Sequence, residues 1–314
     1  MSLRPPRLYH LPNKMEIAYQ SRAEVEFFYK DIFEKEIYLQ HGIVLKDGDC
    51  VFDVGANIGF FTLFAYQKCR PSALFAFEPA PAVFEALRYN TARYAPQARL
   101  FNCGISDRNK VTTFTFYPNS SGLSSFYADR EEEQKVLRTI MLSHLKEGRT
   151  GMDRVWKHAD DLLEERLRSE SFKCKLRTLS DVIQEYHVRQ IDLLKIDVQK
   201  SEMDVLAGIA DEDWKNIRQI VVEVHDLENR LESIVSMLQG YGYSVEIEQE
   251  TQYEGSINFN LYATRKTALT VFDAGLSQQP NGHIPLIPLD ARIKKQGAAL
   301  HRQKQLANQR KKNK

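Results

Sequence analysis

The chain has 314 residues, 43% of them apolar and 27% charged, which suffices for one large core or for a domain of about 240 residues with appendages. It has no apolar run as long as the roughly 18 residues of a membrane span, and its start, MSLRPP, lacks the apolar segment of a secretory signal. Its four cysteines are far apart and form no C-x-x-C pair: Cys50, Cys69, Cys103 and Cys174. These features predict a cytoplasmic protein with no membrane segment and with free, mostly buried thiols rather than zinc ligands or disulfides.

Positive charge is concentrated in the last part of the chain. Residues 291–314 contain nine Lys or Arg and no Asp or Glu, and because the whole chain is +1, the rest carries a net charge of −8. An acidic body disfavours nucleic acid as a substrate, since phosphate binding needs a basic surface over the site. We therefore predict that residues 266–314 form a basic linker or tail, with a docking segment for an acidic protein as the alternative.

The first elements precede the informative part of the sequence. We expect residues 1–20 to be an irregular lead-in and residues 21–265 to form the main domain. Residues 23–33 read AEVEFFYKDIF and have helical spacing, which places Phe27 and Ile32 close to one face.

Residues 51–60, which read VFDVGANIGF, predict a buried strand, a tight turn and the start of a helix. A dinucleotide fingerprint needs G-x-G-x-x-G, and only Gly55 and Gly59 of that pattern are present. Asp53, two residues before Gly55, suits a cofactor with a positively charged amino-acid portion, such as S-adenosylmethionine. An ordinary strand-to-helix turn with structural glycines is the alternative. The candidate cofactor contacts here are Asp53, Gly55, Ala56, Asn57 and Gly59.

Two further strands are predicted to end at the same edge. Residues 73–77 are apolar and end at Glu78, whose carboxylate is placed to accept hydrogen bonds from both ribose hydroxyls of an adenosine. Residues 98–102 form the third strand and lead into residues 103–107, a loop that we expect to cover the adenine. The candidate contacts from these segments are Glu78, Pro79, Cys103, Gly104 and Ser106.

Residues 128–170 differ in character from the segments around them. They are highly charged, contain few β-branched residues, and include helical patterns at 131–145 and 154–167. The β-branched and aromatic segments 111–117 and 172–177, which flank them, read as strands. We interpret residues 128–170 as a helical insertion, which is either a lid over the cofactor crevice or a surface hairpin.

Alternation of strands and helices then resumes. Residues 191–197 and 218–225 are predicted to be the fourth and fifth core strands. Segments 244–248 and 257–263 have only a short connection, so we expect them to pair as an antiparallel hairpin. The pattern predicts an α/β fold: a doubly wound, Rossmann-like, mostly parallel sheet with one antiparallel strand near its edge.

The last residues of the fourth and fifth strands are candidate catalytic groups. Asp197 ends the fourth strand and is also a candidate cofactor contact. Glu223 and His225 lie two apart on the fifth strand, so they point to the same side. A histidine held by a carboxylate can remove a proton from a hydroxyl, because its pKa lies near neutrality. Two alternatives stay open: a core histidine satisfied by backbone groups, and a divalent metal site, for which the ligand spacing is not diagnostic. We expect no metal.

Taken in order, these segments resemble the signature blocks of the FkbM-type methyltransferases. The resemblance covers residues 20–265, so it implies a class I methyltransferase domain over 21–265 that uses S-adenosylmethionine for O-methylation. The family often reads D-V-E-G-x-E after the fourth strand, whereas here Lys200 or Ser201 replaces the glycine. The blocks that carry the resemblance are DVGANIG at 53–59, FEP at 77–79, LKIDV at 194–198 with Glu202, and EVH at 223–225.

The lysine-containing form of that block is similar to the domains embedded in polyketide and peptide megasynthases. This resemblance implies an acceptor hydroxyl on a carrier-protein-bound intermediate, with neighbouring megasynthase domains as partners. A stand-alone O-methyltransferase of a sugar or another free metabolite is one alternative. A non-catalytic nucleotide-binding module is the other.

Overall fold

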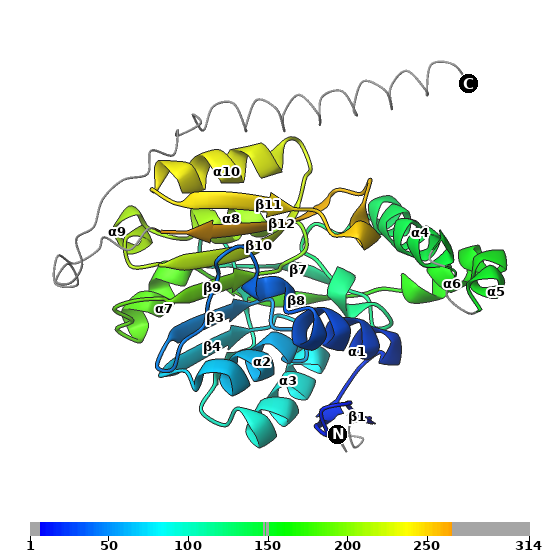
Figure 1. The fold of residues 1–314 in the computed structure, drawn as a ribbon, viewed down its shortest axis with the longest axis horizontal. Helices are drawn as coiled ribbons and strands as arrows, with labels where there is room; N and C mark the ends of the chain where they lie inside the picture. The colour runs from blue at the N-terminus through cyan, green and yellow to red at the C-terminus, as the bar shows by residue number, and fades with distance from the viewer. Residues whose placement is uncertain (1–6, 147, 149–150, 266–314) are drawn as a thin grey trace, which may run out of the picture. The chain divides into compact units, whose positions relative to one another are not determined.

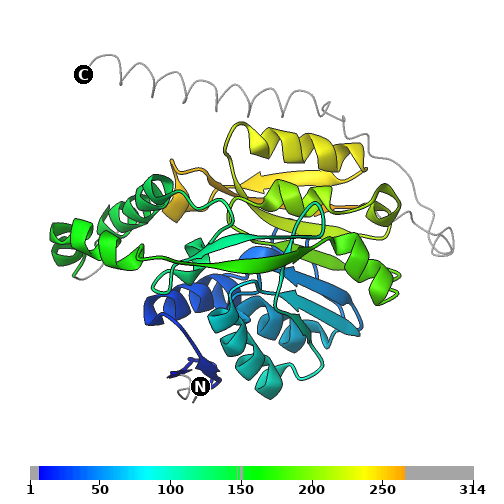
Figure 2. The ribbon, with the colours of Figure 1, turned by 180° about the vertical axis from the view of Figure 1, so that it is seen from behind.

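The computed structural model describes residues 7–146, 148 and 151–265, so the predicted tail at 266–314 lies outside the described residues. A seven-stranded sheet forms the centre, and a three-stranded sheet lies beside it (Figures 1 and 2). Among the described helices, none combines the length and the apolar character that a membrane span requires. All four cysteines are unpaired and buried, as predicted.

The central sheet has the strand order β11-β12-β10-β9-β3-β4-β5. All neighbouring strands are parallel except that β12 runs antiparallel to both β10 and β11. The predicted doubly wound sheet with one antiparallel strand is therefore confirmed, including the hairpin of its last two strands. The strands are β3 (Cys50–Val54), β4 (Ala73–Phe77), β5 (Arg99–Phe101), β9 (Leu193–Ile196), β10 (Gln219–His225), β11 (Ser244–Glu248) and β12 (Asn258–Thr264).

The sheet separates two hydrophobic cores because successive side chains of a strand point to opposite faces. On β3, Val51 packs into the core that contains α2 (Phe60–Cys69) and α3 (Pro81–Tyr94). The next residue, Phe52, packs into the other core, beneath four further helices. These are α7 (Leu179–Glu185), α8 (Glu202–Ala207), α9 (Asp211–Trp214) and α10 (Arg230–Gly240).

The N-terminal segment is more regular than predicted. Strands β1 (Leu8–His10) and β2 (Glu16–Ala18) form an antiparallel pair, so the expected irregular lead-in is wrong for the described residues. The side-chain amide of Asn90 on α3 holds β2, because its Oδ1 accepts from the Ala18 amide at 2.6 Å and its Nδ2 donates to the Ala18 carbonyl at 3.0 Å. Such a contact between distant residues has no local sequence signal.

The predicted helix at 23–33 consists of two parts. Helix α1 (Arg22–Tyr29) continues directly into a π-helical turn, η1 (Lys30–Glu34), and a short 3-10 turn, η2 (Ile37–Leu39), follows. In η1, Asp31 is buried and pairs with Lys35 at 2.6 Å. Segments of π-helix often occur at functional sites, and here α1 and η1 border the central cavity.

The smaller sheet carries the helices of the predicted insertion. It has the order β6-β8-β7, with β6 (Gly104–Ile105), β7 (Lys110–Phe116) and β8 (Glu170–Arg177). Between β7 and β8 the chain forms α4 (Arg130–Lys146), α5 (Met152–Lys157) and α6 (Ala159–Arg166), all within the expected span of 128–170. Figure 1 shows these helices beyond the carboxyl ends of the central strands, near the 3-10 turn η4 (Thr251–Tyr253).

Candidate active site

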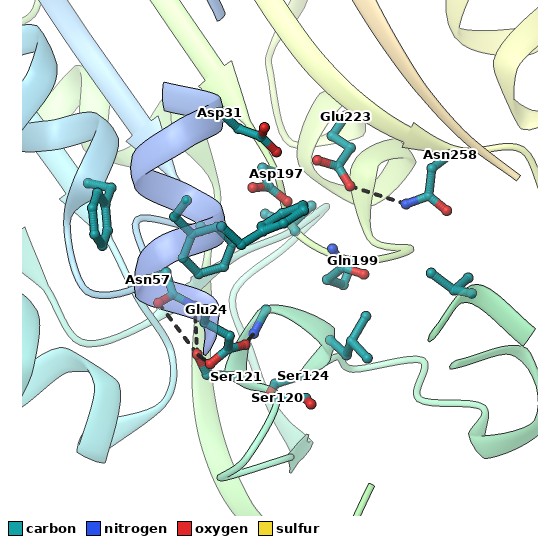
Figure 3. Close-up of a pocket in the computed structure, with 18 of the residues that line it drawn as sticks. Glu24, Asp31, Asn57, Ser120, Ser121, Ser124, Asp197, Gln199, Glu223 and Asn258 are labelled. Carbon is teal, nitrogen blue, oxygen red and sulfur yellow. Dashed lines mark hydrogen bonds between the residues drawn. The ribbon is translucent and has the colours of Figure 1, made fainter. Parts of the chain in front are cut away.

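A cavity of about 690 Å³ lies at the carboxyl ends of the central strands. This volume is in the range of about 300–1,000 Å³ that is typical of small-molecule sites. Its floor includes the loops that follow β3, β4 and β9, and its walls come from α1, η1, η4 and the insertion helices. Figure 3 shows several of its polar side chains.

The loop after β3 lies against the next parallel strand. Gly55 has φ +81°, and a Cβ atom there would lie 1.8 Å from the carbonyl oxygen of Asp197, so only glycine fits. Ala56 and Asn57 line the cavity with Gly55. Gly59 starts α2 with φ +98° and does not line the cavity, since its neighbour is Leu87 of α3. Its role is therefore to allow close packing of two helices.

Glu78 is placed as predicted, at the tip of β4 and facing the cavity together with Pro79. Its carboxylate oxygens accept hydrogen bonds from the backbone amides of Asn57 at 3.0 Å and of Ala80 at 2.8 Å. Burial raises the pKa of Glu78 to about 7. A buried carboxylate oriented in this way can accept hydroxyl hydrogen bonds from a ligand.

Asp53 occupies a different place from the one we expected. It is fully buried and does not line the cavity. Its Oδ2 accepts from the Thr62 hydroxyl at 2.6 Å, and its Oδ1 pairs with the Nζ of Lys195 at 3.0 Å. Lys195 also donates to the Gly55 carbonyl at 2.8 Å. Asp53 therefore fixes the glycine loop from below and does not face a cofactor.

The predicted adenine loop contributes fewer residues than expected. Gly104 and Ile105 line the cavity, because this segment forms β6 and pairs with β8. Cys103 and Ser106, at either end of that short strand, are buried and lie outside the cavity lining. The Ser106 hydroxyl donates instead to Asp107 at 2.9 Å.

The two predicted catalytic carboxylates, Asp197 and Glu223, both face the cavity (Figure 3). Asp197 Oδ2 accepts from the Tyr38 hydroxyl at 3.1 Å and lies 3.7 Å from Lys195 Nζ. Glu223 Oε1 accepts from the side-chain amide of Asn258 at 3.2 Å. Burial and the nearby Asp197 charge raise the pKa of Glu223 to about 8. A carboxylate with such a pKa is a stronger base than an ordinary one and is mostly ionised above about pH 8.

His225, by contrast, does not reach the cavity. Its exposed fraction is 2%, its Nδ1 lies 2.7 Å from Glu202 Oε1, and its Nε2 lies 3.2 Å from Asn258 Nδ2. Burial lowers the pKa of His225, but the nearby carboxylates of Glu202, Glu223 and Asp197 together raise it overall. The expectation that His225 contacts the acceptor directly is not supported by this geometry. Asn258 connects it to Glu223.

Sequence reasoning missed three residues around these carboxylates, namely Tyr38, Lys195 and Asn258. A signal existed for two of them. Lys195 lies two residues before Asp197 on one strand and so shares its face. Asn258 begins the last strand and pairs in register with His225, which the predicted hairpin and sheet order could have indicated. Tyr38 comes from a distant 3-10 turn and has no such signal.

The glycine loop, the second-strand acid and the strand-end carboxylates thus meet in one cavity of a Rossmann-like sheet. This arrangement is that of an S-adenosylmethionine-dependent methyltransferase. Residues 53–245 match the model of the Methyltransferase FkbM domain. The chain belongs to the FkbM methyltransferase family.

Two curated relatives illustrate the membership. The chain is 41% identical over 260 residues to "31-O-demethyl-FK506 methyltransferase FkbM" of Streptomyces tacrolimicus, which covers 82% of this chain and 96% of that protein. It is 40% identical over 262 residues to "AMB antimetabolite synthetase AmbE" of Pseudomonas aeruginosa, which covers 81% of this chain but only 12% of that protein. A crystal structure of Methyltransferase FkbM from Methylobacillus flagellatus aligns with TM-score 0.47 and 13% identity, over 72% of this chain and 46% of that one.

Proposed function

We propose that this enzyme transfers a methyl group from S-adenosylmethionine to a hydroxyl of a polyketide or peptide intermediate that is tethered to a carrier protein. The observation that carries the O-methylation is the pair Asp197 and Glu223, which faces the same cavity as the glycine loop and Glu78. Family membership favours an enzyme over a non-catalytic binding module.

The residues present fit the cofactor. Glu78 would accept hydrogen bonds from the ribose hydroxyls, because its carboxylate faces the cavity and is held by backbone amides alone. Gly55 and Ala56, which line the cavity, would present backbone to the amino-acid portion, and Gly104 would border the adenine. When bound, S-adenosylmethionine supplies an electrophilic methyl group on a sulfonium.

Glu223 is the general base of the proposed reaction. As the acceptor oxygen bonds to the methyl carbon and the carbon–sulfur bond breaks, the hydroxyl proton passes to the Glu223 carboxylate. The Asp197 charge makes Glu223 more basic, and the Tyr38 hydroxyl fixes the Asp197 carboxylate. Positioning of the acceptor and removal of its proton are the two contributions that this geometry supports.

His225 acts through Asn258. In neutral His225 with Nδ1–H directed to Glu202, the Nε2 lone pair can accept one amide hydrogen of Asn258, which leaves the other for Glu223. His225 and Glu202 therefore orient the amide that holds the base. In this proposal His225 is a positioning residue, and Glu223 contacts the reacting proton.

The proposal that the acceptor is tethered to a carrier protein rests on the relatives. The match to AmbE, a synthetase more than eight times as long as the matching region, supports an acceptor bound to a larger assembly. The match to nearly the whole of 31-O-demethyl-FK506 methyltransferase supports the second candidate, a free small metabolite. Methyl transfer should be measured with one hydroxyacyl chain presented both on a carrier protein and as the free acid. Equal or faster transfer to the free acid would exclude the tethered acceptor.

A further inference from the structure

The insertion helices present an apolar wall to the cavity. They contribute nine lining residues, and all but His144 and Arg166 are apolar. On α4 the lining residues Val136, Leu137 and Ile140 follow a spacing of three and four, so they share one helix face. Helix α1 adds an aromatic side chain, Phe27, to the same cavity.

Much of this wall lies outside the protein's three hydrophobic clusters. Apart from Ala23, Pro79 and Tyr253, six apolar lining side chains belong to none of the three hydrophobic clusters that the described residues form. Apolar side chains that border a cavity and stay outside the core are typical of the walls of ligand sites. The six are Phe27, Val136, Ile140, Met152, Val155 and Leu162. We call them the apolar chamber.

The chamber is held in place over the catalytic carboxylates. Glu133, on the same face of α4 as Ile140, forms a buried ion pair with Lys200, whose Nζ lies 3.0 Å from its Oε1. Lys200 belongs to the loop that begins at Asp197. Helix α4 also packs against η4, which lies next to it in Figure 1 and contributes Tyr253 to the cavity. The wall is therefore fixed to two elements of the floor.

We propose that the apolar chamber receives the hydrocarbon body of the acceptor and selects acyl chains by their length. This inference rests on the proposed function, because the acceptor hydroxyl must lie beside Glu223 while the rest of the molecule follows the cavity wall. A sugar placed there would lose hydrogen bonds from its other hydroxyls to water, and the apolar chamber would not replace them. An aliphatic chain loses none and buries its methylene groups.

The test is calorimetric binding of a series of 3-hydroxyacyl chains to the protein loaded with S-adenosylhomocysteine. Wild-type affinity should rise about threefold to fourfold per added methylene until the chamber is full. Ile140→Trp should move the optimum to shorter chains and Ile140→Ala to longer ones, with unchanged affinity for S-adenosylhomocysteine. Leu142→Trp, at an exposed position of the same helix, is the matched control and should leave the profile unchanged.

The outcomes distinguish the proposed chain-length selection by the apolar chamber from the proposed O-methylation. The proposed role of the apolar chamber is wrong if affinity does not depend on chain length. It is also wrong if a sugar binds more tightly than the acyl series. An unchanged length profile in Ile140→Trp would contradict it as well. Length-dependent binding without methyl transfer to any hydroxyl would keep the chamber and reject the O-methylation.

Discussion

Lys200 and Glu133 form an ion pair of 3.0 Å, although no more than 5% of either side chain is exposed. Lys200 adopts φ +69°, a left-handed conformation that favours glycine, so the turn after β9 is formed here without a glycine. The guanidinium of Arg230 supports this turn by donating to the Lys200 carbonyl at 2.6 Å. The ion pair thus ties the loop after β9 to helix α4 of the insertion.

Breaking this ion pair on one side should destabilise the protein strongly. In Lys200→Met the Glu133 charge stays buried without its partner, and we expect the free energy of unfolding to fall by about 3–5 kcal/mol. The double variant Lys200→Met/Glu133→Leu should recover most of that loss, because no charge is left unpaired. Urea denaturation measures the unfolding free energy of both variants. A double variant as unstable as the single one would show that the pair's charges are not what matters.

The sequence was sufficient for the architecture because strands and turns carry local signals. Short apolar runs that end near Asp53–Gly55, Glu78 and Asp197 predicted the strands of the sheet and the edge at which the cavity lies. Those positions follow from the rule that parallel strands share their carboxyl edge. The family followed from the order of the same blocks.

Side-chain partners could not be predicted in the same way. Asp53 looked available to a ligand because Lys195, its partner on the neighbouring strand, is 142 positions away. His225 looked like the strand-end base, but strand β12, which pairs with it, brings Asn258 to its Nε2. Register and burial decide such contacts, and neither is encoded in local spacing.

Glu78→Ala should weaken binding of S-adenosylhomocysteine by about 1.5–3 kcal/mol, the scale of a lost charge-assisted hydrogen bond. Calorimetric titration provides the measurement. Glu85→Ala is the control, because Glu85 is exposed on α3 and pairs only with Arg88 there. Unchanged affinity in Glu78→Ala would contradict the ribose contact.

The binding should also depend on pH. Burial raises the pKa of Glu78 to about 7, so its carboxyl group is mostly ionised above that pH and mostly protonated below it. Affinity should therefore increase as pH rises through 7 in the wild type. Glu78→Gln, which cannot ionise, should lose this dependence.

His225→Gln should reduce both stability and turnover, but turnover less than a change at the base itself. The Glu202 carboxylate loses a buried partner and keeps Arg230 at 2.8 Å, so we expect a loss of about 1–3 kcal/mol in unfolding free energy. Affinity for S-adenosylhomocysteine should not change. Turnover as low as in Glu223→Gln, in a folded variant, would restore His225 as the base.

Glu223→Gln should lower the rate of methyl transfer by roughly 10²–10⁴ without weakening cofactor binding, as expected for a lost general base. Glu246→Gln, at an exposed position of β11, is the control. Because the base acts in its ionised form and its pKa is raised to about 8, the wild-type rate should increase with pH and level off above that value.

The hydrogen bond from Asn258 determines the direction in which the pKa of Glu223 should change when that bond is removed. Its amide donates to Glu223 and so favours the ionised carboxylate, which lowers the pKa of Glu223. Removing the donor in Asn258→Ala should move the inflection of the single-turnover rate to higher pH, whereas Glu223→Gln should abolish it. An inflection that stays in place in Asn258→Ala would mean that the amide does not hold the base, and an inflection that persists in Glu223→Gln would assign the proton to another group.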